Sequence, residues 1–125
     1  MSGQLSDVGV VGLCSVGRSF ALRLAAMGLR VSLWDASPGS AEEFVERQDG
    51  TRGGLVGYAD CEDFVESLNS PRRIIFFETE AGPVSALLRT LLRETDRLLE
   101  YPLLGEDVPL DELTQLELTL VFQMA

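Results

Sequence analysis

The sequence predicts an α/β fold, a doubly wound parallel sheet of about five strands in a single domain spanning residues 1–125. Short apolar runs rich in β-branched residues alternate with amphipathic stretches along the chain, which is the pattern of consecutive strand–helix units. The first run, residues 7–13, is apolar on both faces, as in a strand between two layers of helices. Such units connect by right-handed crossovers, and ligands bind at the carboxyl ends of the strands.

The first unit shows the pattern most fully. Residues 7–13 predict a strand, and residues 15–27 predict a helix with apolar side chains four positions apart. Gly28 is expected to end that helix, since glycine readily adopts the left-handed conformation that closes helices. Residues 30–35 (RVSLWD) predict the second strand.

The next two helices begin at capping signals. After a proline–glycine turn, residues 40–48 predict a helix in which Ser40 and Glu43 have the spacing of a capping box. Residues 55–58 (LVGY) predict the third strand, and a helix follows for which Asp60 is the expected N-cap.

The last third of the chain predicts one more strong unit and a less regular tail. Ile74 to Phe77 predict the fourth strand, and Pro83 begins a long helix whose apolar residues continue to Leu98. Residues 100–115 predict a turn-rich linker, and residues 116–123 (LELTLVFQ) alternate as a fifth strand would.

The charge of the chain excludes some classes of partner. Twenty acidic and ten basic residues give a net charge of −10, which disfavours nucleic acid and anionic membrane surfaces. The sequence shows neither the cationic start of a signal peptide nor a long apolar span. We therefore expect a soluble, cytoplasmic protein.

Few residues in the chain are suited to proton transfer near neutral pH. All ten basic residues are arginine, and histidine is absent, so any general base must be a carboxylate or a thiolate. The two cysteines, Cys14 and Cys61, are too few for a disulfide framework or a metal site. We assign no catalytic residue and no metal ligand.

A glycine-containing turn follows the first predicted strand. Gly12 and Gly17 occupy the first and third glycine positions of a dinucleotide-binding turn, and Asp35 ends the second strand eighteen residues beyond Gly17. The helix that starts here offers free N–H groups and a positive dipole end to a pyrophosphate. Cys14 replaces the second glycine, and its side chain occupies the space through which a pyrophosphate approaches the backbone. A thiolate at that position also opposes the phosphate charge.

The acidic residue predicts which dinucleotide the turn accepts. Asp35 is suited to accept hydrogen bonds from an adenosine ribose, and its charge disfavours a 2′-phosphate, so NAD is favoured over NADP. The alternative is that Asp35 is only a solvated strand-end carboxylate and that the two glycines serve packing. The strand before the turn and the helix after it favour a Rossmann-like nucleotide site.

Three stretches resemble a known family. They are DVGVVGLCSVGRSFALRLAAMGLRVSLWDAS, LVGYADCEDFVESLNSPRRIIFF and EAGPVSALLRTLL, which in this order resemble the amino-terminal coenzyme domain of 6-phosphogluconate dehydrogenase over residues 7–92. The resemblance implies that Gly12, Gly17 and Arg18 lie on a phosphate-binding turn and that Ser37 matches the threonine of an Asn-Arg-Thr clamp. The expected cofactor-binding residues are Gly12, Leu13, Cys14, Val16, Gly17, Asp35, Ser37 and Glu80.

Departures from the family pattern change the expected specificity. The clamp's asparagine is Asp35 here and its arginine, which binds the 2′-phosphate, is Ala36, so the family's NADP preference does not carry over. Glu80 stands where the family has a lysine, beside the nicotinamide path. Residues 93–125 are a diverged tail, and the family's substrate domain, with its catalytic lysine and glutamate, has no counterpart in this sequence.

Two functions of different classes remain. The first is an NAD(P)-binding module without catalysis of its own, and the second is an interaction protein that keeps the fold without the cofactor and pairs with a second copy or another partner. An incomplete gene product without a role is a third interpretation.

The remaining singled-out residues have structural interpretations. We expect Arg72 and Arg73 to be a solvated pair in a turn, Cys61 to be a packing thiol and Trp34 to cover the sheet. Glu78 lies near the expected cleft without a partner cation, and such a carboxylate is not a general acid–base catalyst by itself.

Overall fold

The computed structural model describes residues 5–13, 15–37, 39–48, 54–69, 72–78, 82–93 and 96–102, with the backbone alone at 15, 16, 78, 82–85 and 99–102. The elements are, in chain order, β1 (Val8–Val11), α1 (Ser15–Ala26), β2 (Val31–Trp34), α2 (Ser40–Glu46), β3 (Leu55–Gly57), α3 (Cys61–Glu66), β4 (Arg73–Glu78), α4 (Gly82–Leu91) and β5 (Arg97–Pro102).

The strands form one parallel sheet in the order β3-β2-β1-β4-β5. Val10 in the central strand pairs with Leu33 on one side and Ile75 on the other. The chain therefore winds outward from β1 in one direction through β2 and β3, and in the other through β4 and β5. This confirms the predicted doubly wound, Rossmann-like α/β fold.

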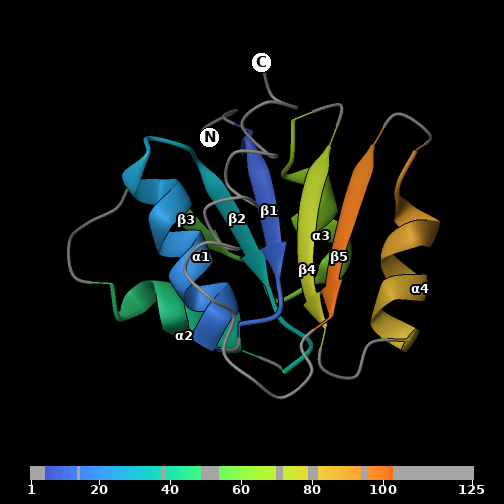
Figure 1. Ribbon diagram of the computed structural model, residues 1–125, viewed down its shortest axis with the longest axis horizontal. Helices are drawn as coiled ribbons and strands as arrows, with labels where there is room; N and C mark the ends of the chain where they lie inside the picture. Colours follow the sequence, from blue (N-terminus) through green and yellow to red (C-terminus); the bar gives the residue numbers. More distant parts are fainter. Residues whose placement is uncertain are drawn as a thin grey trace.

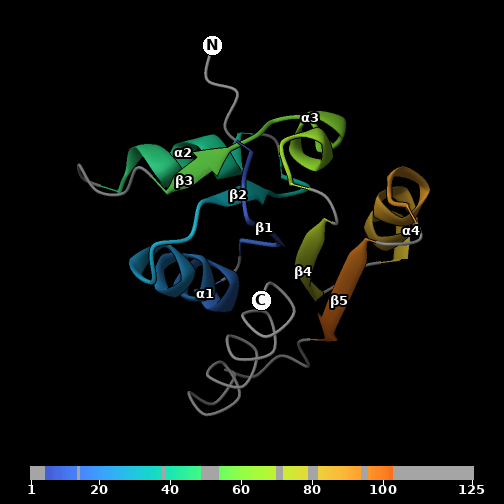
Figure 2. The ribbon, with the colours of Figure 1, turned by 90° about the horizontal axis from the view of Figure 1, so that it is seen from above.

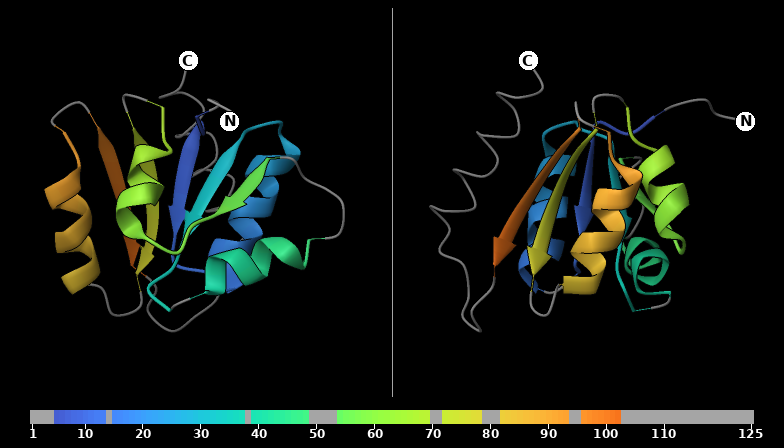
Figure 3. Two further views of the ribbon diagram at one scale, coloured as in Figure 1. Left: turned by 180° about the vertical axis from the view of Figure 1, so that it is seen from behind. Right: turned by 90° about the vertical axis from the view of Figure 1, so that its right-hand side faces the viewer.

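Two apolar layers cover the sheet because alternate strand residues point to opposite faces. On one face Val10, Leu33 and Phe77 pack with Phe20 of α1, and the rings of Phe20 and Phe77 meet edge to face, 5.5 Å apart. On the other face the apolar residues of β1, β2 and β4 pack with α3 and with Leu88 of α4. Accordingly α1 lies in front of the sheet in Figure 1 and α3 lies in front of it when the molecule is seen from behind in Figure 3.

The two edges of the sheet differ in what surrounds them. Strands β1, β4 and β5 run downward in Figure 1, so their carboxyl ends lie at the lower edge. Helix α1 begins at this edge, and α2 lies along it. The view from above, in Figure 2, shows α1 on the side of the sheet opposite α3 and α4. In a sheet of this kind the lower edge is where a ligand is expected.

Helix α1 ends as predicted. Gly28 has φ +92°, its N–H donates to Ala25 O at 3.0 Å, and the N–H of Leu29 donates to Leu24 O at 3.3 Å. Together these bonds satisfy carbonyls that the end of the helix would otherwise leave without a donor.

The predicted capping box of α2 is wrong. The N-cap is Gly39, in the left-handed conformation, and no side chain caps the helix; Ser40 is already helical. The helix therefore begins one residue earlier than the capping-box spacing requires, and the N–H of Glu43 donates to the carbonyl oxygen of Gly39 at 3.0 Å. In contrast, Asp60 does cap α3, where its Oδ1 accepts from Glu62 N at 3.1 Å.

The prediction for the end of α4 is also wrong. The helix ends at Leu91, and Arg97–Pro102, predicted as helix end and linker, form strand β5. Leu91, Leu92 and Leu98 all pack against the apolar layer on the α3 side. The sequence therefore shows the same pattern of apolar residues in the helix and in the strand that follows, and the pattern does not mark the end of the helix. The predicted strand at 116–123 lies outside the described residues.

Arg72 and Arg73 are not a solvated pair. The side chain of Arg72 is 13% exposed; its guanidinium pairs with Asp96 and donates from Nε to Val65 O at 2.8 Å. Arg73 is half-buried and is the first residue of β4.

Within the described residues, no helix is long and apolar enough to cross a membrane.

Candidate functional site

The turn after β1 depends on glycine at its first position. Gly12 has φ +94°, and a Cβ built there would lie 2.5 Å from the backbone oxygen of Phe77. Its N–H donates to Trp34 O at 3.2 Å. Both the backbone conformation and the space therefore require glycine here, as the sequence predicted.

Gly17 lets α1 pack closely against that turn. A Cβ on Gly17 would overlap the carbonyl oxygen of Gly12 and lie 3.4 Å from the ring of Phe77. The first turn of α1 is thus held directly against the turn and β4. This is the close helix–sheet packing that the third glycine of a dinucleotide-binding turn provides.

Asp35 joins the two loops at the carboxyl edge. Its Oδ1 accepts the N–H of Leu13 at 2.8 Å, and its Oδ2 accepts the N–H of Ser37 at 2.9 Å. One carboxylate at the end of β2 therefore fixes both the turn before α1 and the loop before α2. A carboxylate accepts about four hydrogen bonds, so Asp35, which is half-buried, keeps acceptor capacity for a ligand hydroxyl.

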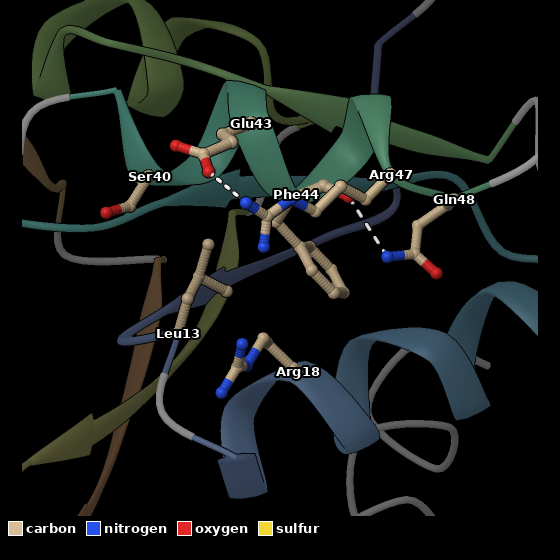
Figure 4. Close-up of a pocket in the computed structure, with 7 residues that line it drawn as sticks. All are labelled: Leu13, Arg18, Ser40, Glu43, Phe44, Arg47 and Gln48. Atoms are coloured by element: carbon tan, nitrogen blue, oxygen red, sulfur yellow. Dashed lines mark hydrogen bonds and ion pairs between the residues drawn. The ribbon is translucent and has the colours of Figure 1, made fainter.

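A cavity of about 270 Å³ opens beside these loops, between α1 and α2 (Figure 4). Its walls are formed by Leu13, Arg18, Ser40, Glu43, Phe44, Arg47 and Gln48. In Figure 4 the ring of Phe44 and the side chain of Arg18 reach into it from opposite helices. The cavity combines apolar surface with hydrogen-bonding groups, as small-molecule sites do.

The charges of the described residues around the start of α1 favour an anion. The first turn of α1 contains no acidic residue, and Arg18 is exposed there. On α2, Arg47 Nη2 pairs with Glu43 Oε1 at 2.5 Å, which largely cancels its charge toward the cavity. The helix dipole and Arg18 therefore act in the same direction.

The structure brings together most of the predicted site residues that it describes. Gly12, Leu13, Asp35 and Ser37 lie on the two loops at one edge, and Gly17 lies in the first turn of α1 against the Gly12 turn. Val16 lies in the first turn of α1, described by its backbone. Cys14 and Glu80 lie outside the described residues, as does the side chain of Glu78.

The sequence did not identify the α2 wall of the cavity. Helix α2 lies along the edge of the sheet, and its residues Ser40, Glu43, Phe44, Arg47 and Gln48 line the cavity; no ligand-binding motif marks them in the sequence. Within the described residues there is no group of three or more His, Cys, Asp or Glu suited to hold a metal ion.

Two structural interpretations are confirmed. Trp34 is 8% exposed in the apolar layer, with Nε1 donating to Ala59 O at 3.3 Å. Cys61 is 5% exposed in the same layer. Burial, together with the charges of Asp60 and Glu62, raises the pKa of the Cys61 thiol to about 11, so little thiolate is present at neutral pH.

Comparison with known proteins gives consistent relatives. The 6-phosphogluconate dehydrogenase of Chlamydia trachomatis is 33% identical over 87 residues, covering 70% of this chain and 18% of the relative. The NAD(+)-dependent enzyme of Bacillus subtilis is 32% identical over 100 residues, covering 78% and 21%. The chain thus spans about a fifth of the length of these curated relatives.

Solved structures show the same fold. A Plasmodium falciparum 6-phosphogluconate dehydrogenase structure aligns with a TM-score of 0.66 at 19% identity, covering 77% of this chain and 21% of that one. Residues 7–97 match the family described as the NAD binding domain of 6-phosphogluconate dehydrogenase. The chain therefore belongs to the family of NAD-binding domains of 6-phosphogluconate dehydrogenase.

Proposed function

We propose that this chain binds a nicotinamide dinucleotide at the carboxyl edge of its sheet, and that it binds NAD in preference to NADP. The observation that carries the proposal is the position of Asp35, whose carboxylate is fixed to both loops of that edge at 2.8 and 2.9 Å. The family to which residues 7–97 belong supports the class of ligand.

The residues at the edge fit the parts of a dinucleotide. The start of α1, held against the Gly12 turn by Gly17, suits the pyrophosphate, because its N–H groups and dipole attract anions. Leu13 and Phe44 offer apolar surface in the neighbouring cavity for the adenosine half. When bound, the nicotinamide ring supplies hydride transfer; the chain's own residues bind and orient it.

The preference for NAD follows from the charges near the ribose. Asp35 accepts hydrogen bonds from ribose hydroxyls and repels a 2′-phosphate. Ala36 is exposed and neutral, so it offers no cation, and Arg47 on the cavity wall is paired with Glu43. Curated relatives of comparable similarity are named as NADP(+)-dependent and as NAD(+)-dependent, so the proposed preference depends on the charges near the ribose.

We further propose that the chain alone does not oxidise 6-phosphogluconate. It has neither lysine nor histidine to take up a proton from the substrate hydroxyl near neutral pH. The proposed role is that of a coenzyme-binding module.

Calorimetry with NAD, NADH, NADP and NADPH tests this proposal. We expect saturable binding of NAD and NADH and at least about tenfold weaker binding of their 2′-phosphorylated forms, because a charge repulsion near a phosphate costs on the order of 1 kcal/mol or more. If none of the four ligands gives a binding heat at millimolar concentration, dinucleotide binding is excluded and the alternative function as an interaction protein is favoured.

A further inference from the structure

A second cavity lies at the edge of the sheet opposite the proposed dinucleotide site. Its volume is about 450 Å³, and it is lined by Arg89, Leu92, Arg93, Asp96, Arg97 and Leu98. Figure 1 shows the end of α4 and the beginning of β5 at the upper edge, whereas α1 begins at the lower one. The volume falls in the range of about 300–1,000 Å³ that is common for small-molecule sites.

The acidic residue of this cavity does not cancel its positive charge. The side chain of Asp96 is 1% exposed, and its oxygens accept the backbone N–H groups of Arg72 at 2.7 Å and Arg93 at 2.9 Å. Arg72 Nη1 also donates to it at 3.3 Å. Its charge is therefore already balanced by Arg72, which does not line the cavity.

Two exposed arginines carry the positive charge. Arg93 follows α4 and Arg97 begins β5, and both are exposed. Among the described residues, neither guanidinium takes part in an ion pair. Arg89, four residues before Arg93, lines the same cavity and has a further interaction of its own.

Apolar surface accompanies these cations. Leu92 and Leu98 are half-buried in the α3-side layer and line the cavity between the arginines. Guanidinium groups match the geometry of phosphate and carboxylate oxygens. The chain as a whole has a net charge of −10, so a local group of cations is the part of its surface that attracts anions.

We propose that the cavity between α4 and β5 binds a small molecule bearing phosphate or carboxylate groups, at a site separate from the dinucleotide edge. Arg93 and Arg97 hold the anionic group, and Leu92 and Leu98 contact the rest of the ligand. The proposal does not depend on dinucleotide binding.

The test is titration of the whole chain with two probes, inorganic pyrophosphate and citrate, in the presence of excess NAD. Binding is followed by backbone amide shifts and calorimetry. We expect at least one probe to bind saturably, with a Kd below about 1 mM, and to shift the amides of Arg93 and Leu98. Binding of pyrophosphate alone identifies a phosphate site, and binding of citrate alone identifies a carboxylate site.

The matched variants are Arg93→Gln with Arg97→Gln, and a control with Ala26→Glu and Met27→Glu. Each pair lowers the net charge by two, and both control positions are exposed at the end of α1. We expect the arginine pair to weaken probe binding about tenfold or more, and the control to change it less than about threefold. Urea unfolding confirms that both remain folded.

The proposal is overturned if neither probe saturates, if both variants weaken binding equally, or if the shifts are confined to Leu13, Gly17 and Ser37. NAD affinity is measured separately on the arginine variant. Unchanged NAD affinity supports two separate sites, and a parallel loss of NAD and probe binding shows that there is only one.

Discussion

Single residues determine how closely the first helix approaches the sheet. Gly12 needs both its positive φ and the absence of a Cβ, whereas Gly17 needs only the absence of a Cβ, because its backbone conformation is ordinary. Two positions with the same residue type thus have separable physical requirements, which substitutions can distinguish.

Gly17→Ala should destabilise the protein although alanine favours helices. The added Cβ meets the carbonyl oxygen of Gly12, which is backbone and has little freedom to move. We expect a loss of about 1–3 kcal/mol in the free energy of unfolding, as for overpacking in a core, measured by urea denaturation. Gly39→Ala is the control, because nothing lies within 4 Å of its Cβ and only its φ of +79° is unfavourable; its cost should be about 1 kcal/mol. A Gly17→Ala protein as stable as the original would contradict the packing described.

Cys61 should resist alkylation in the folded protein. Burial and the neighbouring acids raise its pKa from 9.0 to about 11, so about a hundredfold less thiolate is present at neutral pH. Labelling with iodoacetamide at pH 7, followed by peptide mass spectrometry, should modify Cys61 at least about a hundredfold more slowly than in the urea-unfolded chain. Similar rates in the two states would show that the helix start is open to solvent.

The residues of the site were predicted unevenly for physical reasons. Gly12, Gly17 and Asp35 were identified because a turn between a strand and a helix is set by local backbone requirements. The sequence did not predict that Asp35 accepts hydrogen bonds from both Leu13 and Ser37. The direction of a carboxylate depends on loops that come together only in the folded chain.

At the scale of elements, one buried carboxylate joins four segments. Asp96 accepts hydrogen bonds from the residues before β4 and after α4, and Arg72 in turn reaches Val65 of α3. The N–H of Arg97 donates to Arg72 O at 2.7 Å where β5 begins. The position of the sheet's last strand therefore depends on this cluster.

Asp96 should contribute stability that disappears in acid. Burial acts to raise its pKa, but the N–H groups of Arg93 and Arg72 and the Arg72 charge outweigh it, so the pKa lies below 3.8. Because the folded-state pKa is depressed, the contribution is complete above the unfolded-chain pKa near 3.8 and is lost as the pH falls through the folded value. We expect Asp96→Asn to cost about 1–3 kcal/mol at pH 7 and progressively less below pH 4.

Urea unfolding of both proteins from pH 3 to 7 measures that difference. Glu46→Gln is a suitable control, since Glu46 is exposed on α2 and its loss should change stability by less than about 0.5 kcal/mol at any of these pH values. A cost for Asp96→Asn that stays constant over the whole range would refute the assigned pKa direction.

The sequence predicted four strand–helix units because each carries its own apolar periodicity. It missed the boundary between α4 and β5 because Leu91, Leu92 and Leu98 contribute to the same apolar layer in two different elements. The Asp96 cluster, which brings together residues 24 positions apart, lies between the two elements, and such contacts leave no local periodicity.

At the scale of the whole molecule, opposite edges of the sheet have different chemistry. The carboxyl edge carries Asp35 and the start of α1, and the amino edge carries the arginine-lined cavity. The parallel direction of the strands separates these two edges, and it was predictable as a class, since consecutive strand–helix units form parallel sheets.

The cofactor preference should be reversible by two substitutions at the carboxyl edge. Asp35→Asn with Ala36→Arg removes the carboxylate that repels a 2′-phosphate and adds a cation for it, so we expect the NAD to NADP affinity ratio to fall by about tenfold or more. Calorimetry measures the ratio. Asp35→Asn alone should weaken NAD without a comparable gain for NADP. A ratio that does not change in the folded double variant would show that Asp35 does not face the ribose.

The most direct test of the central claim is to follow backbone amide shifts while NAD is added to the unmodified protein. We expect saturable shifts at Leu13, Gly17 and Ser37, with one common Kd that agrees with calorimetry, because these amides surround the Asp35 carboxylate and the start of α1. Shifts confined to residues 89–98, or no saturable shift at millimolar NAD, would contradict it.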